Sequence, residues 1–234
     1  MAQEDVNPFT APGAKDEVAL NSDWKQITLR KGLKLWFVSL CTGMVVQLAT
    51  TLVGVGFGTT TNGMWYLSYS TIQLVSLLNV FVCIAAGLNL FRAAPPVAAR
   101  YLAAIVLLFT MITPISIIGL PVLSRMLAVQ AVGWVQVNEK IFQTICSISL
   151  MVLLRMIAKR FEQRDAYGIA GLVICLELGL IILPIAFVLA GTPMQSTGDL
   201  FTIYSLCTVG VLFVKSMVVY LLMSHLRFLA KTAD

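Results

Sequence analysis

The stretch LWFVSLCTGMVVQLATTLVGVGFGTTTNGMWYLSYSTIQLVSLLNVFVCIAAGLNLF, from Leu35 to Phe91, decides the fold, because none of its 57 residues is Asp, Glu, Lys or Arg. About 25% of the residues in a typical soluble domain are charged, so a water-soluble fold of this size could not bury such a run. Two membrane crossings could, since each takes about 20 apolar residues to span about 30 Å of hydrocarbon. The stretch therefore predicts a pair of transmembrane helices.

The rest of the chain has the same character. Of its 234 residues, 59% are hydrophobic and 12% are charged. The net charge of +5 comes from basic clusters beside apolar runs, which is typical of orientation signals in membrane proteins and argues against nucleic-acid binding. Residues 1–23 are polar and contain Pro8 and Pro12, which predicts a disordered tail. The tail is acidic and has no basic stretch followed by an apolar one, so we expect no signal peptide.

Six apolar segments have about the length of one membrane span. They are Leu35–Phe57, Leu67–Phe91, Tyr101–Leu123, Val137–Ala158, Ile169–Ala190 and Leu200–His225. We therefore predict an all-α, polytopic transmembrane bundle of about six helices over residues 33–226, with cytoplasmic tails at residues 1–32 and 227–234. A short basic helix, Trp24–Lys34, is expected to lead into the first span. The start of the fourth span is the least defined, because the apolar residues within Arg125–Lys140 could lie along the interface or lengthen the helix.

The distribution of basic residues predicts that both termini lie in the cytoplasm. Thirteen Lys and Arg residues flank one side of the six spans, and two, Arg125 and Lys140, flank the other. Positive residues favour the cytoplasmic side of a membrane. An even number of spans also returns the chain to the side on which it began.

The cysteines and the histidine carry no sign of a metal site or a disulfide framework. Single cysteines stand inside apolar runs, at Cys41, Cys83, Cys146, Cys175 and Cys207. Disulfide frameworks and zinc sites use clustered cysteines, so we interpret these as small packing residues. The one histidine, His225, excludes a bis-histidine haem or a histidine-rich metal site within one chain. We expect no metal and no cofactor.

Two oppositely charged residues lie inside predicted spans. Glu177 is eight residues past the start of the fifth segment, and Lys215 is ten residues before the end of the sixth. At about 1.5 Å per residue, both lie about 12–15 Å from the cytoplasmic side, on helices that a short loop makes antiparallel neighbours. A lone charge at the bilayer centre costs about 2.5–3.5 kcal/mol on insertion scales. We therefore predict an intramembrane ion pair between Glu177 and Lys215.

Polar residues on other segments could share this layer. Gln47 and Asn79 are expected near the middle of the membrane, each on a helix face of small and polar residues that suits close packing in lipid. Three interpretations of the Glu177–Lys215 pair stay open: a structural fastener, a proton or ion site, or two residues that do not touch. Glu139 and Lys140 form a second acid and base, expected to be solvated at the interface. Prolines inside the third and fifth segments favour kinks, which would suit a transporter.

No signature of a membrane enzyme is present. The HExxH zinc motif, the GxSxG nucleophile turn, a Walker-type glycine loop and paired intramembrane aspartates are all absent from the sequence. We therefore expect no catalytic residues and no enzymatic activity.

Four stretches carry a resemblance to known proteins. They are NPF at Asn7–Phe9, RAAPPVAARY at Arg92–Tyr101, RMIAKRFEQRDA at Arg155–Ala166 and YLLMSHLRFLAK at Tyr220–Lys231. With the six spans, they resemble a loose group of uncharacterised bacterial six-span integral membrane proteins. The resemblance covers nearly the whole chain, by layout more than by identity. It implies a multi-pass protein of a bacterial inner membrane and carries no activity over.

These observations predict a non-enzymatic integral membrane protein that packs with or organises other membrane components, with Glu177 and Lys215 as a structural pair. The alternative is a small proton- or ion-coupled transporter that uses Glu177. A water-accessible cavity reaching Glu177 would favour transport, whereas a dry bundle with an exposed face of small residues would favour packing. The expected partners are the lipid bilayer and either other membrane proteins or further copies of the chain, but no nucleic acid.

Overall fold

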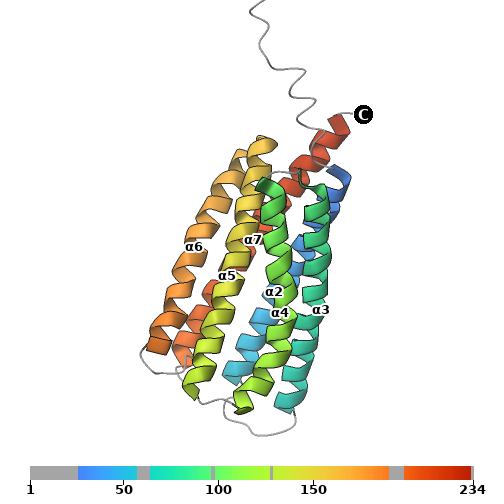
Figure 1. Cartoon of the computed structure of the whole chain (residues 1–234). Helices are drawn as coiled ribbons and strands as arrows, with labels where there is room; N and C mark the ends of the chain where they lie inside the picture. Colours follow the sequence, from blue (N-terminus) through green and yellow to red (C-terminus); the bar gives the residue numbers. More distant parts are fainter. Residues whose placement is uncertain (1–25, 57–63, 96–97, 127–128, 190–197, 233–234) are drawn as a thin grey trace, which may run out of the picture.

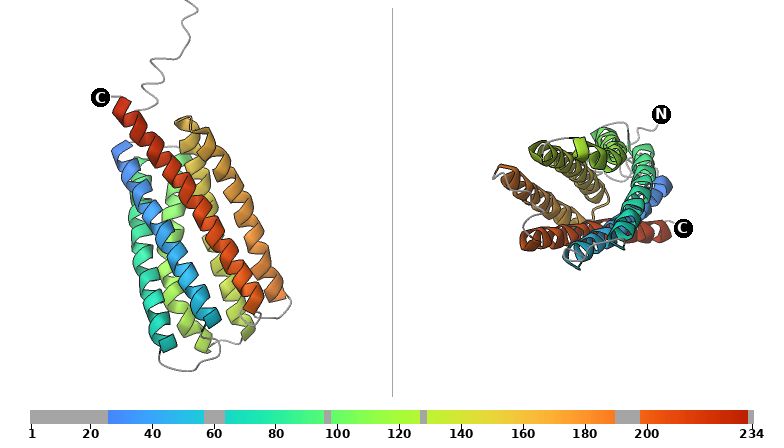
Figure 2. Two further views of the ribbon diagram at one scale, coloured as in Figure 1. Left: turned by 180° about the vertical axis from the view of Figure 1, so that it is seen from behind. Right: turned by 90° about the horizontal axis from the view of Figure 1, so that it is seen from below.

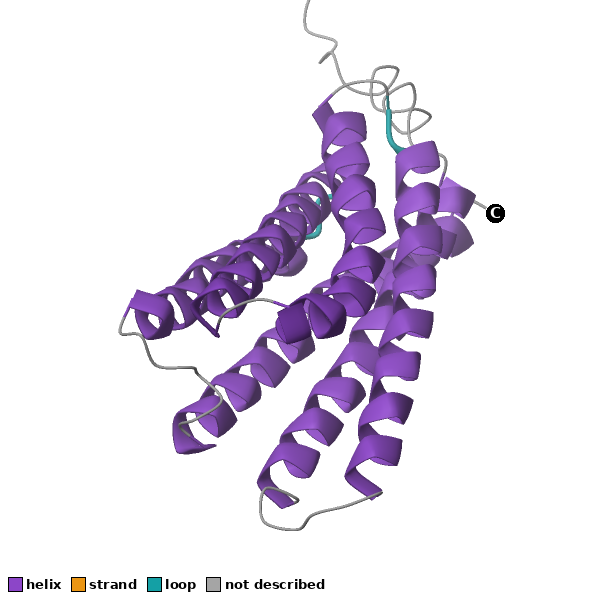
Figure 3. Ribbon diagram, turned by 60° about the horizontal axis from the view of Figure 1, so that its bottom comes forward, coloured by secondary structure: helices purple, strands orange, loops and turns teal. Residues whose placement is uncertain are grey.

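The computed structural model describes residues 26–56, 64–95, 98–126, 129–189 and 198–232. Within these ranges the chain is helical apart from short turns, and no strand occurs (Figure 3). The helices are α2 (Gln26–Gly56), α3 (Met64–Ala93), α4 (Ala98–Met126), α5 (Val129–Arg160), α6 (Arg164–Leu189) and α7 (Gly198–Thr232). The predicted all-α bundle is thus confirmed. The predicted tail at residues 1–23 lies outside the described residues.

The helices differ from the predicted segments mainly at their ends. The basic entry helix is not separate, because α2 runs without a break from Gln26 into the first span. The stretch before the fourth span lengthens a helix, since α5 already begins at Val129. Proline breaks neither of the helices that contain it: α4 continues past Pro114 and Pro121, and α6 continues past Pro184.

Length and composition make this chain a multi-pass membrane protein. Within the described part of the chain, five helices contain a stretch long and apolar enough to cross a membrane: Gln26–Leu52, Thr71–Ala93, Lys140–Arg160, Arg164–Ala186 and Thr202–Ala230. In α4 the apolar stretch found among the described residues is shorter, Ala98–Thr113. Large apolar side chains are also exposed on all six helices, for example Leu78, which is 57% exposed. Such a surface suits contact with lipid tails rather than water.

The helices form a ring in chain order. Each packs against the next from α2 to α7, α7 closes the ring against α2, and α5 also touches α7. Seen from behind, α7 crosses the bundle obliquely between α2 and α6 (Figure 2). Because neighbouring helices alternate in direction, α2, α4 and α6 begin at the end where α3, α5 and α7 finish (Figure 1). We call this end the basic end, since exposed Lys and Arg residues gather there: Lys31, Lys34, Arg92, Arg100, Lys159, Arg164 and Arg227.

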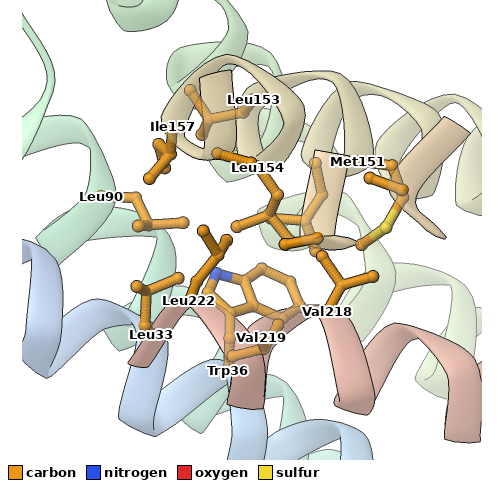
Figure 4. Close-up of a cluster of buried hydrophobic side chains, with 14 of the residues drawn as sticks. Leu33, Trp36, Leu90, Met151, Leu153, Leu154, Ile157, Val218, Val219 and Leu222 are labelled. Atoms are coloured by element: carbon orange, nitrogen blue, oxygen red, sulfur yellow. The ribbon is translucent and has the colours of Figure 1, made fainter. Parts of the chain in front are cut away.

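The tightest apolar packing lies in the half of the bundle next to the basic end. Figure 4 shows side chains from α2, α3, α5 and α7 converging there. Fully buried members of this cluster include Leu33, Leu90, Leu154, Ile157 and Leu222. A buried Leu side chain makes 40–60 atom contacts, so dispersion at this cluster is the main attraction between helices in a medium as apolar as the side chains themselves.

Small residues set the close approach of helices in the same half. A Cβ atom at Gly32 of α2 would lie 3.2 Å from the backbone nitrogen of Leu90 in α3. Between α3 and α4, a Cβ atom at Gly87 would lie 3.3 Å from the side chain of Leu107. Small residues at such contacts let helix backbones approach each other in lipid.

The turn between α5 and α6 is fixed by backbone and side-chain hydrogen bonds. Glu162 adopts a left-handed φ of 56°, and the amide of Gln163 donates to the carbonyl of Ala158 at 2.8 Å. This is the pattern of a Schellman cap, which usually has Gly at the left-handed position. His225 Nε2 of α7 lies 2.8 Å from the carbonyl oxygen of Phe161, so the single histidine ties the last helix to this turn.

Candidate functional site: the intramembrane ion pair

Glu177 and Lys215 each lie at the middle of a long helix. Glu177 is 13 residues from the start of α6 at Arg164, and Lys215 is 17 residues from either end of α7. Ser147 of α5 is 13 residues before that helix ends at Arg160. At about 1.5 Å per residue, Ser147 and Glu177 each lie about 20 Å from the basic end. The three side chains therefore meet deep within the span.

The structure brings these three residues together. Lys215 Nζ forms an ion pair with Glu177 Oε1, and the hydroxyl of Ser147 donates to the same oxygen at 3.0 Å. Glu177 and Lys215 are each 7% exposed. A charge-assisted hydrogen bond is roughly twice as strong as a neutral one, and pairing removes the cost of a lone charge in hydrocarbon. The site joins α5, α6 and α7 and is neutral as a whole.

Gln47 and Asn79 do not join this pair among the described residues. Gln47 Nε2 donates to the hydroxyl of Ser205 at 2.7 Å, ten residues along α7 from Lys215. Asn79 Nδ2 donates to the carbonyl of Ser39 at 3.2 Å. Both side chains therefore bond to neighbours other than the ion pair, and their expected depth near the middle of the membrane stays a prediction.

Instead, polar contacts join each pair of neighbouring helices around the ring. The side chains of Ser39 and Cys83 join α2 to α3 at 2.6 Å. The hydroxyls of Thr51 and Ser205 join α2 to α7. Cys146 of α5 donates to the carbonyl of Val106 in α4 at 3.6 Å. Arg100 of α4 donates to the carbonyl of Ala94, the residue that follows α3, at 3.1 Å. The contacts of Glu177 with Ser147 and Lys215 join α5, α6 and α7.

A second polar group lies on α5 and α7, toward the end opposite the basic end. Lys140 Nζ stands 5.4 Å from the ring centroid of Tyr204, and the Lys140 side chain is partly exposed, so its expected contact with water stays a prediction. The hydroxyls of Tyr204 and Thr144 are buried, and neither has a hydrogen-bond partner among the residues that the structure describes. Thr144 is one turn from Ser147 on the same helix face. The Glu139 side chain lies outside the described residues.

Arg155 extends the α5–α6 contact toward the basic end. Its guanidinium carbon lies 4.1 Å from the centroid of the Tyr167 ring. A Cβ atom at Gly171 would come within 3.6 Å of the same guanidinium, so the glycine leaves room for it on α6. Arginine over an aromatic face is attracted by the ring quadrupole.

The cysteines are free thiols in the described structure. Cys83 and Cys146 make the interhelical hydrogen bonds given above, while Cys175 and Cys207 are exposed on the outer surface. The first two are therefore polar contacts as well as small packing residues, a role that composition alone did not predict.

Sequence reasoning also missed Ser147. The sequence does place Ser147 at the depth of Glu177, because each residue lies the same number of positions from the basic residues that end α5 and begin α6. Serine is too common in membrane helices for that count alone to single it out. No family model, curated protein or solved structure matches the chain, so function is argued from this geometry.

Proposed function

We propose that this chain is a non-enzymatic integral membrane protein that packs with other membrane components through its outer surface. The proposal rests on one observation: the negative charge of Glu177 is paired inside the bundle with Lys215, and the same carboxylate accepts a hydrogen bond from Ser147. An acid in a membrane helix is by default a functional candidate. Here its partners come from the two neighbouring helices, and the arrangement has the properties of a fastener between α5, α6 and α7.

The outer face of α6 is the surface that suits a packing role. Gly168, Leu172, Cys175 and Gly179 follow a 4-3-4 spacing and are all exposed, so they share one face of the helix. A Cβ atom at Gly168 or Gly179 would meet nothing within 4 Å. Small residues on a lipid-facing surface let a further transmembrane helix approach closely, and no contact within the bundle explains these two glycines.

Cross-linking in native membranes tests this role. A variant that keeps Cys175 as its only cysteine is labelled with a benzophenone maleimide and irradiated. We expect a cross-linked product, and we expect Gly179→Leu to abolish it, because a bulky side chain one turn away holds a partner helix off. The matched control places the probe at Leu78→Cys of α3, an exposed position beside the exposed side chains of Leu74 and Phe81. Equal cross-linking from both positions would contradict the proposal.

The alternative function is proton- or ion-coupled transport through Glu177. The buried hydroxyls of Thr144 and Tyr204 favour it, because buried waters commonly bond to polar groups that have no protein partner. Proton flux into liposomes that exceeds the flux of a Glu177→Leu/Lys215→Met variant would establish transport in place of the packing role.

We also propose that the protein lies in a bacterial inner membrane with the basic end in the cytoplasm. The gathering of basic residues at one end supports this orientation. In a cysteine-free background, single cysteines at Gln163 and near the C-terminus are expected to be protected from an impermeant maleimide in intact cells. Single cysteines at Thr61 and Ser196 are expected to react. The opposite labelling pattern would reverse the orientation.

A further inference from the structure

A polar pocket opens at the basic end, away from the ion pair. It has a volume of about 440 Å³ and lies between α2, α3 and α4. Its lining residues are Thr28, Lys31, Asn89, Phe91, Arg92 and Arg100. Three of these six side chains are cations, one is a hydroxyl, one is an amide, and none is a carboxylate.

Parts of this pocket are held in place. Arg100 is fixed by its hydrogen bond to the Ala94 carbonyl and by its position 5.7 Å from the centroid of the Phe91 ring. The side-chain amide nitrogen of Asn89 donates to the carbonyl of Ala85 at 2.8 Å, which holds the Asn89 side chain in place. The close approach of α2 and α3 at Gly32 fixes the neighbouring Lys31 and Asn89 relative to each other.

The charges of the pocket are not neutralised in the described structure. Lys31, Arg92 and Arg100 form no ion pair with a carboxylate among the residues that the structure describes, whereas Lys215 does so with Glu177. The side chains of Lys31 and Arg92 are also exposed. Three cations around one cavity repel one another, so an anion in the cavity would relieve that repulsion.

The depth of the pocket indicates the source of the anion. Arg92 is one residue from the end of α3, and Arg100 is two residues from the start of α4. The apolar spans end here, at the level where lipid headgroups carry their phosphates. Basic pockets between transmembrane helices at this level bind anionic lipid headgroups, and arginine pairs well with phosphate oxygens.

We propose that this pocket binds the phosphate group of an anionic ligand, with a membrane phospholipid as its source. Lys31 and Arg92 supply the charges that attract the phosphate, and Arg100 supplies a fixed guanidinium. Thr28 and Asn89 supply uncharged polar groups for the remaining headgroup oxygens.

Native mass spectrometry of the full chain in a neutral detergent tests this site. We expect phosphatidylglycerol to bind more tightly than phosphatidylcholine, which carries the same phosphate but no net charge. Lys31→Gln/Arg92→Gln should weaken phosphatidylglycerol binding by about fivefold for each charge removed. The control, Lys34→Gln/Arg227→Gln, removes the same charge from exposed positions at the basic end outside the pocket and should bind as the wild type does.

Photolabelling and competition with a soluble phosphate test the same pocket in two further ways. A photoactivatable phosphatidylglycerol should label wild-type protein within residues 26–34 and 89–100, which needs no substitution and so does not depend on how the variants fold. Glycerol phosphate that competes as well as the lipid would identify a soluble phosphate as the source. Binding by the pocket variant equal to the wild type, or an equal loss in the control, would overturn the site.

Discussion

Glu177→Gln is expected to lower the melting temperature of the purified protein by several degrees, and Lys215→Met should do the same. Each change leaves one buried residue of the pair without its partner. Breaking a buried pair costs about 3–5 kcal/mol in soluble proteins, and we expect the lower part of that range because a lone side chain in a membrane can snorkel or recruit water. Thermal unfolding in a mild detergent, followed by fluorescence or circular dichroism, measures the loss.

The double variant Glu177→Leu/Lys215→Met should recover much of this stability. It leaves no buried charge, and replacing a buried pair with apolar residues is often neutral or stabilising. The exchange Glu177→Lys/Lys215→Glu should be tolerated better than either charge reversal alone. Ser147→Ala serves as the milder control, since it removes one hydrogen bond at 3.0 Å and leaves the ion pair in place.

The outcome also separates the two candidate functions. If the pair is a fastener, the rescued double variant keeps the Cys175 cross-link of the wild type. A double variant that is stable but has lost a measurable proton flux would instead assign Glu177 to transport. If the losses of the single variants Glu177→Leu and Lys215→Met simply add in the double-mutant cycle, the side chains do not interact, and the fastener between them is refuted.

The ion pair could be predicted because few physical facts decide it. α6 and α7 each carry one charged residue in the middle of the span, and a short connection makes these two helices neighbours. The free-energy cost of an unpaired charge in lipid is large, so the two charges are expected to pair. The number and order of the helices could be predicted for the same reason, since span length and the absence of charge leave little choice.

The neighbours of Gln47 and Asn79 could not be predicted in this way. Their partners depend on the angle at which helices cross, and that angle is set by packing at many positions together. The position of Lys140 beside the Tyr204 side chain depends on helix packing in the same way, because it requires α5 to contact α7 across the bundle. Sequence spacing fixes which residues share a helix face, but it does not fix which helix that face meets.

Most of the helices extend beyond the predicted apolar segments, for a physical reason. Hydropathy marks the part of a helix that lies in hydrocarbon, whereas α7 continues past His225, the predicted end of its span, to Thr232. The backbone hydrogen bonds of a helix do not require apolar side chains. Once a span is formed, adding a residue to it is far easier than starting a new helix.

Leu154→Ala should produce the second large effect, by opening a cavity in the apolar cluster near the basic end. Leu154 is fully buried among side chains from the neighbouring helices (Figure 4). In soluble cores this substitution costs about 2–5 kcal/mol, as a transfer term and a cavity term together. In a membrane protein the transfer term largely disappears, because the helices separate into surroundings as apolar as leucine. We therefore expect about 2 kcal/mol, chiefly from the dispersion attraction that the side chains around the cavity no longer have.

The matched control is Leu178→Ala in α6, where the side chain is 52% exposed on the outer surface. Lipid or detergent can fill the space that this substitution leaves, so we expect a change within about 0.5 kcal/mol. Thermal unfolding of both variants in the same detergent gives the comparison. A cost for Leu154→Ala as small as that for Leu178→Ala would mean that the helices are not packed against one another at this level. A cost well above the expected value would mean that apolar burial drives this bundle as it does a soluble core, and that the argument from the surrounding lipid is wrong.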